Sequence, residues 1–155
     1  MKVLIVYDTL HGNTEKIAKA LKEGIASKHE VKLIKAAESK ISDIKNIEML
    51  MLGSPTHGGW YTEPIKNFLG AIPEKGLQNI KAAAFDTGST KENQNIFVKA
   101  LIGFFGYASP RIAKVLNKKE ANNIGSETFF VLDMKGPLKD GEIERAKEWA
   151  RRIIS

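Results

Sequence analysis

Short apolar runs alternate with amphipathic stretches along this chain, and that alternation limits the folds open to it. Residues 2–7 (Lys-Val-Leu-Ile-Val-Tyr) form a nearly unbroken apolar run rich in β-branched side chains, which is typical of a strand buried on both faces. After a polar loop the period changes, because Ile17, Leu21 and Ile25 recur every fourth residue, as in an amphipathic helix. Strands that alternate with helices imply βαβ units. The sequence therefore predicts an α/β fold with a doubly wound parallel sheet.

The rest of the chain continues the pattern. Further strands are predicted at Glu30–Lys35 (an edge strand), Ile47–Leu52, Lys81–Phe85 and Thr128–Leu132. A helix is predicted at Glu63–Leu69, because Pro64 suits a first helical turn. The last helix is expected to start with Asp140 as its cap, with acidic residues in its first turn and Arg151 and Arg152 in its last. No linker or repeat divides the 155 residues, so we expect one domain spanning 1–155.

Composition removes several kinds of chemistry. The absence of cysteine excludes disulfides, thiolate metal sites and cysteine nucleophiles. His11, His29 and His57 do not follow a metal-ligand spacing. The apolar runs are far shorter than the about 20 residues that a membrane-spanning helix needs, and no secretory-signal pattern opens the chain. We therefore expect a cytoplasmic protein without a membrane span.

The charge balance is positive, at +6. A basic surface attracts acidic partners, although the lysines could equally serve solubility alone. The positive residues are spread along the chain rather than gathered into a run, which argues against a nucleic-acid partner.

The loop after the first strand, residues 8–14 (Asp-Thr-Leu-His-Gly-Asn-Thr), has the composition of an anion site. Its hydroxyls and its glycine surround the start of a helix, where unpaired N–H groups and the helix dipole favour negative charge. It has neither the glycine spacing of a dinucleotide fingerprint nor the Gly-Lys-Thr of a triphosphate loop. With no lysine or arginine in it, the loop suits a monophosphate. The alternative is an ordinary polar turn with a capped helix.

Residues 5–21 (Ile-Val-Tyr-Asp-Thr-Leu-His-Gly-Asn-Thr-Glu-Lys-Ile-Ala-Lys-Ala-Leu) resemble the flavodoxin signature. Its positions are filled by Ile5, Val6, Tyr7, Thr9, Gly12, Thr14, Ala18 and Leu21. The resemblance covers almost the whole chain and implies a five-stranded sheet in the order 2-1-3-4-5, with FMN as the cofactor. It also implies that FMN is bound by Thr9, Leu10, His11, Gly12, Asn13 and Thr14. His11 departs from the pattern, which usually has a hydroxyl residue there; its ring either donates to the phosphate or lies exposed in the loop.

The second loop is residues 53–60 (Gly-Ser-Pro-Thr-His-Gly-Gly-Trp), which is similar to the flavin loop of flavodoxin-like proteins. The resemblance implies that Pro55, Thr56, His57, Gly58, Gly59 and Trp60 bind the cofactor, with Trp60 stacked on the flavin ring. The paired glycines tolerate positive φ, which a peptide that flips beside the flavin needs. In the alternative interpretation this is a surface turn, with Trp60 folded onto the domain.

The third loop contributes Asp86, Thr87, Gly88 and Ser89, and the resemblance implies that their N–H groups and hydroxyls bind the pyrimidine edge of the flavin. It lacks the tyrosine that many flavodoxins place here, so the outer flavin face is either open or covered by an aromatic residue from 97–107. Residues 99–126 depart most from the family, and two short helices are predicted there, the second beginning at Ser109-Pro-Arg. The aromatic residues at 104–107 are expected either in the core or at an interface.

The function that these features indicate is electron transfer between redox partner proteins, acidic ones in particular, through the flavin semiquinone and hydroquinone. The protein is expected to be a monomer or a weak homodimer and an electron carrier rather than a stand-alone enzyme. Two alternatives stay open. One is a flavodoxin-like NAD(P)H-dependent quinone or flavin reductase that transfers two electrons, and the other is a non-redox module that has lost FMN.

Overall fold

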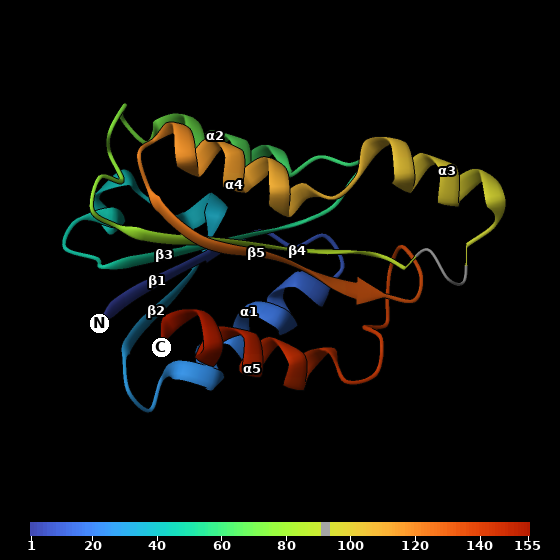
Figure 1. The fold of residues 1–155 in the computed structure, drawn as a ribbon, viewed down its shortest axis with the longest axis horizontal. Coiled ribbons are helices and arrows are strands. Elements are labelled where there is room, and N and C mark those ends of the chain that lie inside the picture. The colour runs from blue at the N-terminus through green and yellow to red at the C-terminus, as the bar shows by residue number, and fades with distance from the viewer. Residues whose placement is uncertain (91–93) are drawn as a thin grey trace.

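A parallel sheet forms the centre of the protein, which is described by a computed structural model over residues 1–90 and 94–155. Its five strands run in the spatial order β2-β1-β3-β4-β5, as the resemblance implies, and β2 lies at an edge (Figure 1). The strands are β1 (Lys2–Tyr7), β2 (Glu30–Lys35), β3 (Met49–Pro55), β4 (Lys81–Ser89) and β5 (Asn122–Val131). The predicted fold class is therefore confirmed.

Helices cover both faces of this sheet. One layer consists of α1 (Asn13–Ile25) and α5 (Glu142–Ile154), and the other contains α2 (Glu63–Ala71) and α4 (Ala108–Lys118). Two short 3₁₀ helices, at Ala36–Glu38 and Ile41–Ile44, connect β2 to β3. Figure 1 shows α3 (Ile96–Phe105) extending past the carboxyl end of the sheet, at the right of the view.

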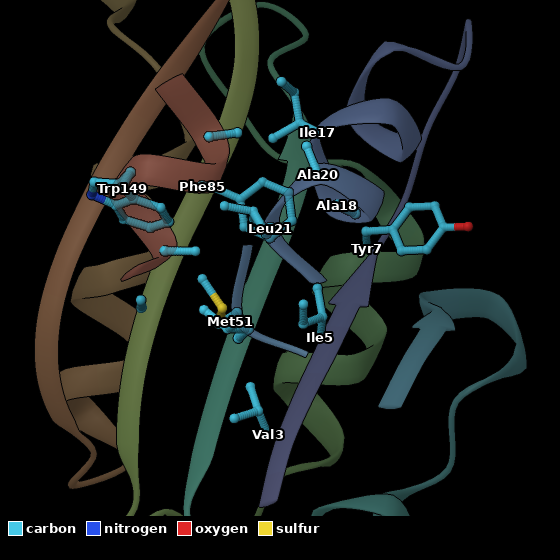
Figure 2. Close-up of a cluster of buried hydrophobic side chains, with 14 of the residues drawn as sticks. Val3, Ile5, Tyr7, Ile17, Ala18, Ala20, Leu21, Met51, Phe85 and Trp149 are labelled. Atoms are coloured by element: carbon cyan, nitrogen blue, oxygen red, sulfur yellow. The ribbon is translucent and has the colours of Figure 1, made fainter. Parts of the chain in front are cut away.

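The two faces of the sheet bury separate hydrophobic cores because successive strand residues point to opposite sides. Val3, Ile5 and Tyr7 of β1 face α1 and α5, in the cluster that Figure 2 shows. Leu4 and Val6 of the same strand belong to the cluster under α2 and α4. This double burial explains why residues 2–7 read as an unbroken apolar run rather than an alternating one.

Three strands differ from their predicted bounds. β3 spans Met49–Pro55 rather than Ile47–Leu52, β4 continues past Phe85 to Ser89, and β5 spans Asn122–Val131 rather than Thr128–Leu132. In each case backbone pairing with a neighbouring strand, rather than the apolarity of the side chains, determines where the strand begins or ends. The register of β4 with β5, for example, pairs Asp86 with Thr128 and Thr87 with Phe129.

Two helices occupy most of residues 99–126 as predicted, but both predicted caps are wrong. The cap position of α4 is Tyr107, and Ser109 lies inside the first turn. At α5 the cap position is Gly141, which adopts a left-handed φ of 85°, so Asp140 lies one residue too early. A glycine in that conformation starts a helix through its backbone alone.

The stretch Ile96–Lys118 is long and apolar enough, by length and composition, to cross a membrane, which is weak evidence for a span. The structure interrupts it at Gly106, with a φ of 71°, and divides it into helices of 10 and 11 residues. A helix of 10 residues is about 15 Å long, half of a bilayer core. In the second helix Ile112 and Leu116 are fully buried against the sheet. Neither helix alone has the length of a span.

Candidate functional site

The carboxyl ends of β1, β3 and β4 meet at one edge of the sheet, where ligands of doubly wound folds bind. Two adjoining cavities lie there, one of about 120 Å³ beside the start of α1 and one of about 350 Å³ beside α3. They share Thr56, His57, Ser89 and Met134. The three predicted loops are thus brought together around one continuous site.

Most of the predicted site residues line these cavities. The first is lined by Thr9, Leu10, His11, Asn13, Thr14, Pro55, Thr56, His57, Thr87, Gly88 and Ser89 from the predicted set. The second adds Gly58 and Gly59. Three predicted residues line neither cavity, namely Gly12, Trp60 and Asp86.

The start of α1 supplies donors to the smaller cavity. Gly12 precedes the helix with a φ of 86°, and its N–H donates to the Thr9 hydroxyl oxygen at 2.9 Å. The N–H groups of the first turn have no partner within a helix and carry the positive end of its dipole. Asn13 holds the loop in place, since its side-chain amide donates to the carbonyl of Lys135 at 3.1 Å. The loop therefore presents neutral donors to the smaller cavity, and anion binding there stays a prediction.

A pair of buried hydroxyls joins this loop to the sheet. Thr14 Oγ1 and Thr87 Oγ1 are 2.8 Å apart, and both side chains are almost fully buried. One of the two hydroxyls donates to the other, so the acceptor of the pair keeps its own hydrogen for another partner. The pair therefore offers one O–H donor to the wall of the smaller cavity.

The second loop ends in a tight turn. His57 and Trp60 exchange backbone hydrogen bonds of 2.9 and 3.0 Å, and between them Gly58 and Gly59 have φ values of 55° and 80°. Positive φ at both central residues defines the type I′ turn, which favours glycine strongly. Gly59 also packs closely, because a Cβ there would lie 2.6 Å from Phe105 Cβ. The turn needs glycine at both positions, as the sequence suggested.

Trp60 lies outside the two cavities. The residue is 53% exposed, and the guanidinium of Arg111 lies 4.2 Å from the centroid of its ring. Arg111 also donates to the carbonyl of Phe105 at 2.8 Å, so it connects the turn to the end of α3. This position is closer to the interpretation in which Trp60 folds onto the domain, and the stacking of Trp60 on a flavin stays a prediction.

Asp86 lies behind the site rather than in it. Its carboxylate is fully buried and accepts hydrogen bonds from the Thr56 hydroxyl, from the Thr128 hydroxyl at 2.7 Å and from the Ala108 N–H at 3.1 Å. Burial raises the pKa of this carboxyl above its ordinary value, while the donated hydrogen bonds oppose that rise. Asp86 thus ties the second loop, α4 and β5 together, and the contact predicted for it at the flavin edge is not part of the observed lining.

Sequence reasoning left the far wall of the larger cavity open. Tyr107 forms part of that wall, with its hydroxyl donating to the Ser89 carbonyl at 3.1 Å and its ring against Gly88, where a Cβ would lie 2.7 Å away. Burial raises the pKa of its phenol, and the charge of Asp86 adds to that rise, so the hydroxyl remains a donor. Met134 lines both cavities and was not predicted. It reaches the site only because the segment after β5 folds back, a contact with no local sequence signal.

Comparison with known proteins identifies the family. Residues 5–149 match the family described as flavodoxin. A flavodoxin of Aquifex aeolicus is 39% identical over 69 residues, which are 43% of this chain and 37% of that protein. An uncharacterized protein of Methanocaldococcus jannaschii, MJ0732, is 38% identical over 60 residues, 36% of this chain and 15% of that protein. The alignments thus span less than two fifths of either curated relative.

Solved structures agree on the fold. The oxidised flavodoxin 1 of Bacillus cereus has a TM-score of 0.78 at 17% identity, over 99% of this chain and 97% of that one. A flavodoxin from the domain Archaea has a TM-score of 0.72 at 21% identity, over 99% and 96%. The rubredoxin:oxygen oxidoreductase of Desulfovibrio gigas has a TM-score of 0.62 at 24% identity, over 98% of this chain and 35% of that one.

Flavodoxins bind FMN, and the residues at this site fit that molecule. The smaller cavity has the neutral donors of the first turn of α1 and the hydroxyl pair, which suit a phosphate. The larger cavity is lined mainly by apolar side chains, including Leu101, Ile102 and Phe105, which suit a planar ring. The match over residues 5–149, the fold and the donor set agree: the chain belongs to the flavodoxin family, whose members bind FMN.

Proposed function

We propose that this protein carries electrons one at a time between redox proteins through one bound FMN. The observation that supports this most directly is the pair of adjoining cavities, with polar donors at the α1 end and apolar side chains at the α3 end. Bound FMN supplies one- and two-electron redox chemistry, while the protein controls its access and its potential.

At the polar end, the protein holds an anion without a cation in the cavity wall. The described residues that line the smaller cavity include no lysine or arginine. Binding then depends on backbone N–H groups of α1, on the hydroxyl pair of Thr14 and Thr87, and on the exposed ring of His11. Such neutral donors suit a terminal monophosphate, which a helix N-terminus binds well.

At the apolar end, the chain surrounds the larger cavity with apolar side chains and places one glycine peptide beside it. Leu101, Phe105 and Tyr107 form an apolar wall, and Phe105 packs against Gly59 of the turn. The peptide between Gly58 and Gly59 can reverse its N–H and C=O because neither residue carries a Cβ. The turn can therefore present either a donor or an acceptor to the cavity.

The surface beside the larger cavity suits an acidic partner. We call Ile96, Phe97, Lys99, Leu101 and Phe104 the α3 surface. None of the side chains of α3 is buried, and Ile96, Phe97 and Phe104 are 87%, 70% and 83% exposed. Residues 94–119, which include α3 and α4, contain five lysines and arginines and no acidic residue. An exposed apolar patch with positive charge around it is typical of a protein-binding surface that selects acidic partners.

The two alternatives are separated by two assays on the same preparation. The electron-carrier proposal expects FMN fluorescence to be quenched on titration with the protein, and expects NADH oxidation with benzoquinone no faster than with free FMN. Protein-dependent NADH oxidation would favour the two-electron reductase instead. Absence of FMN binding would favour the non-redox module.

We further propose that the carrier works in the cytoplasm as a monomer or a weak homodimer. The α3 surface is the face on which a second copy would compete with an acidic partner. Sedimentation that stays monomeric at micromolar concentration supports this, and a tight dimer contradicts it.

A further inference from the structure

The segment that follows β5 carries the last of the four methionines of the chain, and this side chain differs from the others in its exposure. Met49 and Met51 of β3 are fully buried, and Met1 is partly buried against the core. Met134 is 72% exposed. It also lines both cavities of the cofactor site. The most exposed methionine thus lies where the two parts of the site adjoin.

We propose that Met134 is a site of oxidation by hydrogen peroxide, and that its conversion to the sulfoxide weakens the binding of FMN. This inference rests on the proposed function only in that it needs FMN in the site.

Hydrogen bonds hold the backbone around Met134 against the site. The segment folds back after β5, because the Leu132 N–H donates to the Pro137 carbonyl at 2.9 Å. Asn13, in the first turn of α1, donates from its side-chain amide to the carbonyl of Lys135 at 3.1 Å. The residue next to Met134 is therefore tied to the loop that borders the smaller cavity, which keeps the methionine beside the site.

The modification needs hydrogen peroxide and no other reactant. The thioether sulfur attacks one oxygen of the peroxide, the O–O bond breaks, an S–O bond forms, and the second oxygen leaves as water with both protons. The sulfur loses two electrons, and the peroxide gains them. Reduced flavins pass two electrons and two protons to dioxygen and thereby produce hydrogen peroxide. The oxidant is therefore one that flavin chemistry itself generates.

Oxidation changes the polarity of the wall that a cofactor contacts. The methionine thioether is apolar and flexible, whereas the sulfoxide is polar. Leu101, Ile102 and Phe105, on the wall of the larger cavity, offer a sulfoxide oxygen no hydrogen-bond donor from their side chains. A ligand that spans both cavities takes this oxygen away from water, and that costs binding free energy. FMN therefore binds the oxidised protein more weakly.

The test compares the protein with a variant that lacks the reactive sulfur. The folded wild type and Met134→Leu are each treated with hydrogen peroxide, which is then removed with catalase. Peptide mass mapping gives the extent of oxidation at every methionine. The dissociation constant of oxidised FMN is measured by fluorescence quenching before the treatment, after it, and after repair of the sulfoxide by methionine sulfoxide reductases.

We expect Met134 to be oxidised at least about tenfold faster than Met49 and Met51, because peroxide reaches the buried sulfurs only when the structure opens. The dissociation constant of the wild type should rise about tenfold on treatment and return after repair. In Met134→Leu, whatever its starting affinity, the treated and untreated samples should agree within about twofold, because leucine has no sulfur to oxidise.

Oxidation of the buried methionines as fast as Met134 would overturn the proposal, and so would complete oxidation of Met134 with no change in FMN affinity. An equal loss of affinity in Met134→Leu would assign the effect to another residue and would also overturn it. If the untreated wild type binds no FMN, the proposed function fails and takes this inference with it. The untreated sample therefore distinguishes the two failures.

Discussion

At the scale of single residues, the two turn glycines differ in what surrounds them. A Cβ on Gly58 would meet nothing within 4 Å, whereas one on Gly59 would lie 2.6 Å from Phe105 Cβ and 2.7 Å from its carbonyl oxygen. Both residues have positive φ, so either alanine is strained by about 1–2 kcal/mol. The difference between the two variants therefore measures how tightly the turn packs on α3.

We predict that Gly58→Ala lowers the free energy of unfolding by about 1 kcal/mol. Gly59→Ala should cost about 2–4 kcal/mol, because the clash with Phe105 adds an overpacking cost. Urea denaturation at a fixed FMN concentration measures both. Equal losses in the two variants would show that Gly59 does not pack on the end of α3 in solution.

Asp86 predicts a pH dependence of stability whose sign follows from its raised pKa. The pKa of this carboxyl is higher in the folded state than its ordinary value of 3.8, which applies in the unfolded state. Between the unfolded and folded pKa values, the folded state therefore binds more protons than the unfolded state. The free energy of unfolding then falls as the pH rises through that window. Compared with Asp86→Asn, which does not titrate, the wild type should lose stability between about pH 4 and the folded pKa. Urea denaturation of both at several pH values tests this, and a constant difference contradicts it.

At the scale of elements, the sequence predicts the bounds of the first two strands and misses those of the other three. Residues 2–7 and 30–35 have the predicted bounds. Residues 86–89 were interpreted as a loop because they are polar, yet they continue β4. Alternation along that strand then turns Asp86 toward Thr56 and α4 and Thr87 toward Thr14.

The reach of short-range sequence patterns also explains which site residues could be predicted. Loops that follow apolar strands are visible in the sequence, so most of the cavity lining was predictable. The sequence offered an aromatic residue from 97–107 as one alternative for the far wall, and Tyr107 lines it. The direction of a side chain, and a wall residue from a distant segment such as Met134, depend on backbone pairing and tertiary packing, for which short-range patterns carry no signal.

Arg111 joins two elements, and its loss should weaken both contacts. Its guanidinium stacks on Trp60 at 4.2 Å and donates to the carbonyl of Phe105 at the end of α3. We predict that Arg111→Ala lowers the free energy of unfolding by about 1–2 kcal/mol. Lys114→Ala, an exposed cation on the same helix, should change it by less than about 0.5 kcal/mol. The same small change in both variants, measured by urea denaturation, would rule out a structural role for the stacked pair.

The α3 surface leads to a prediction about partner choice. Lys99 lies among its exposed apolar residues, whereas Lys28 lies between α1 and β2, just before the amino end of that edge strand. With an acidic [2Fe–2S] ferredoxin as probe, Lys99→Glu should slow electron transfer about tenfold at low salt, and Lys28→Glu by less than about twofold. Stopped-flow spectroscopy at several salt concentrations measures the rates. Equal effects of the two substitutions would place the contact elsewhere.

At the scale of the whole molecule, the fold gathers three loops from distant parts of the chain at one edge of the sheet. Two cores hold that edge in place, one on each face. The cofactor cavities open beside a helix that carries exposed apolar side chains and only positive charge. This arrangement supports the proposed electron transfer, since electrons must pass between two proteins in contact.

The measurement that tests this account most directly is the absorption spectrum of the FMN-loaded protein during stepwise reduction with dithionite. We predict two separate one-electron stages, with a long-wavelength band that rises with the first electron and falls with the second. Bleaching in a single two-electron step, with no intermediate band, would contradict one-electron transfer and favour the reductase.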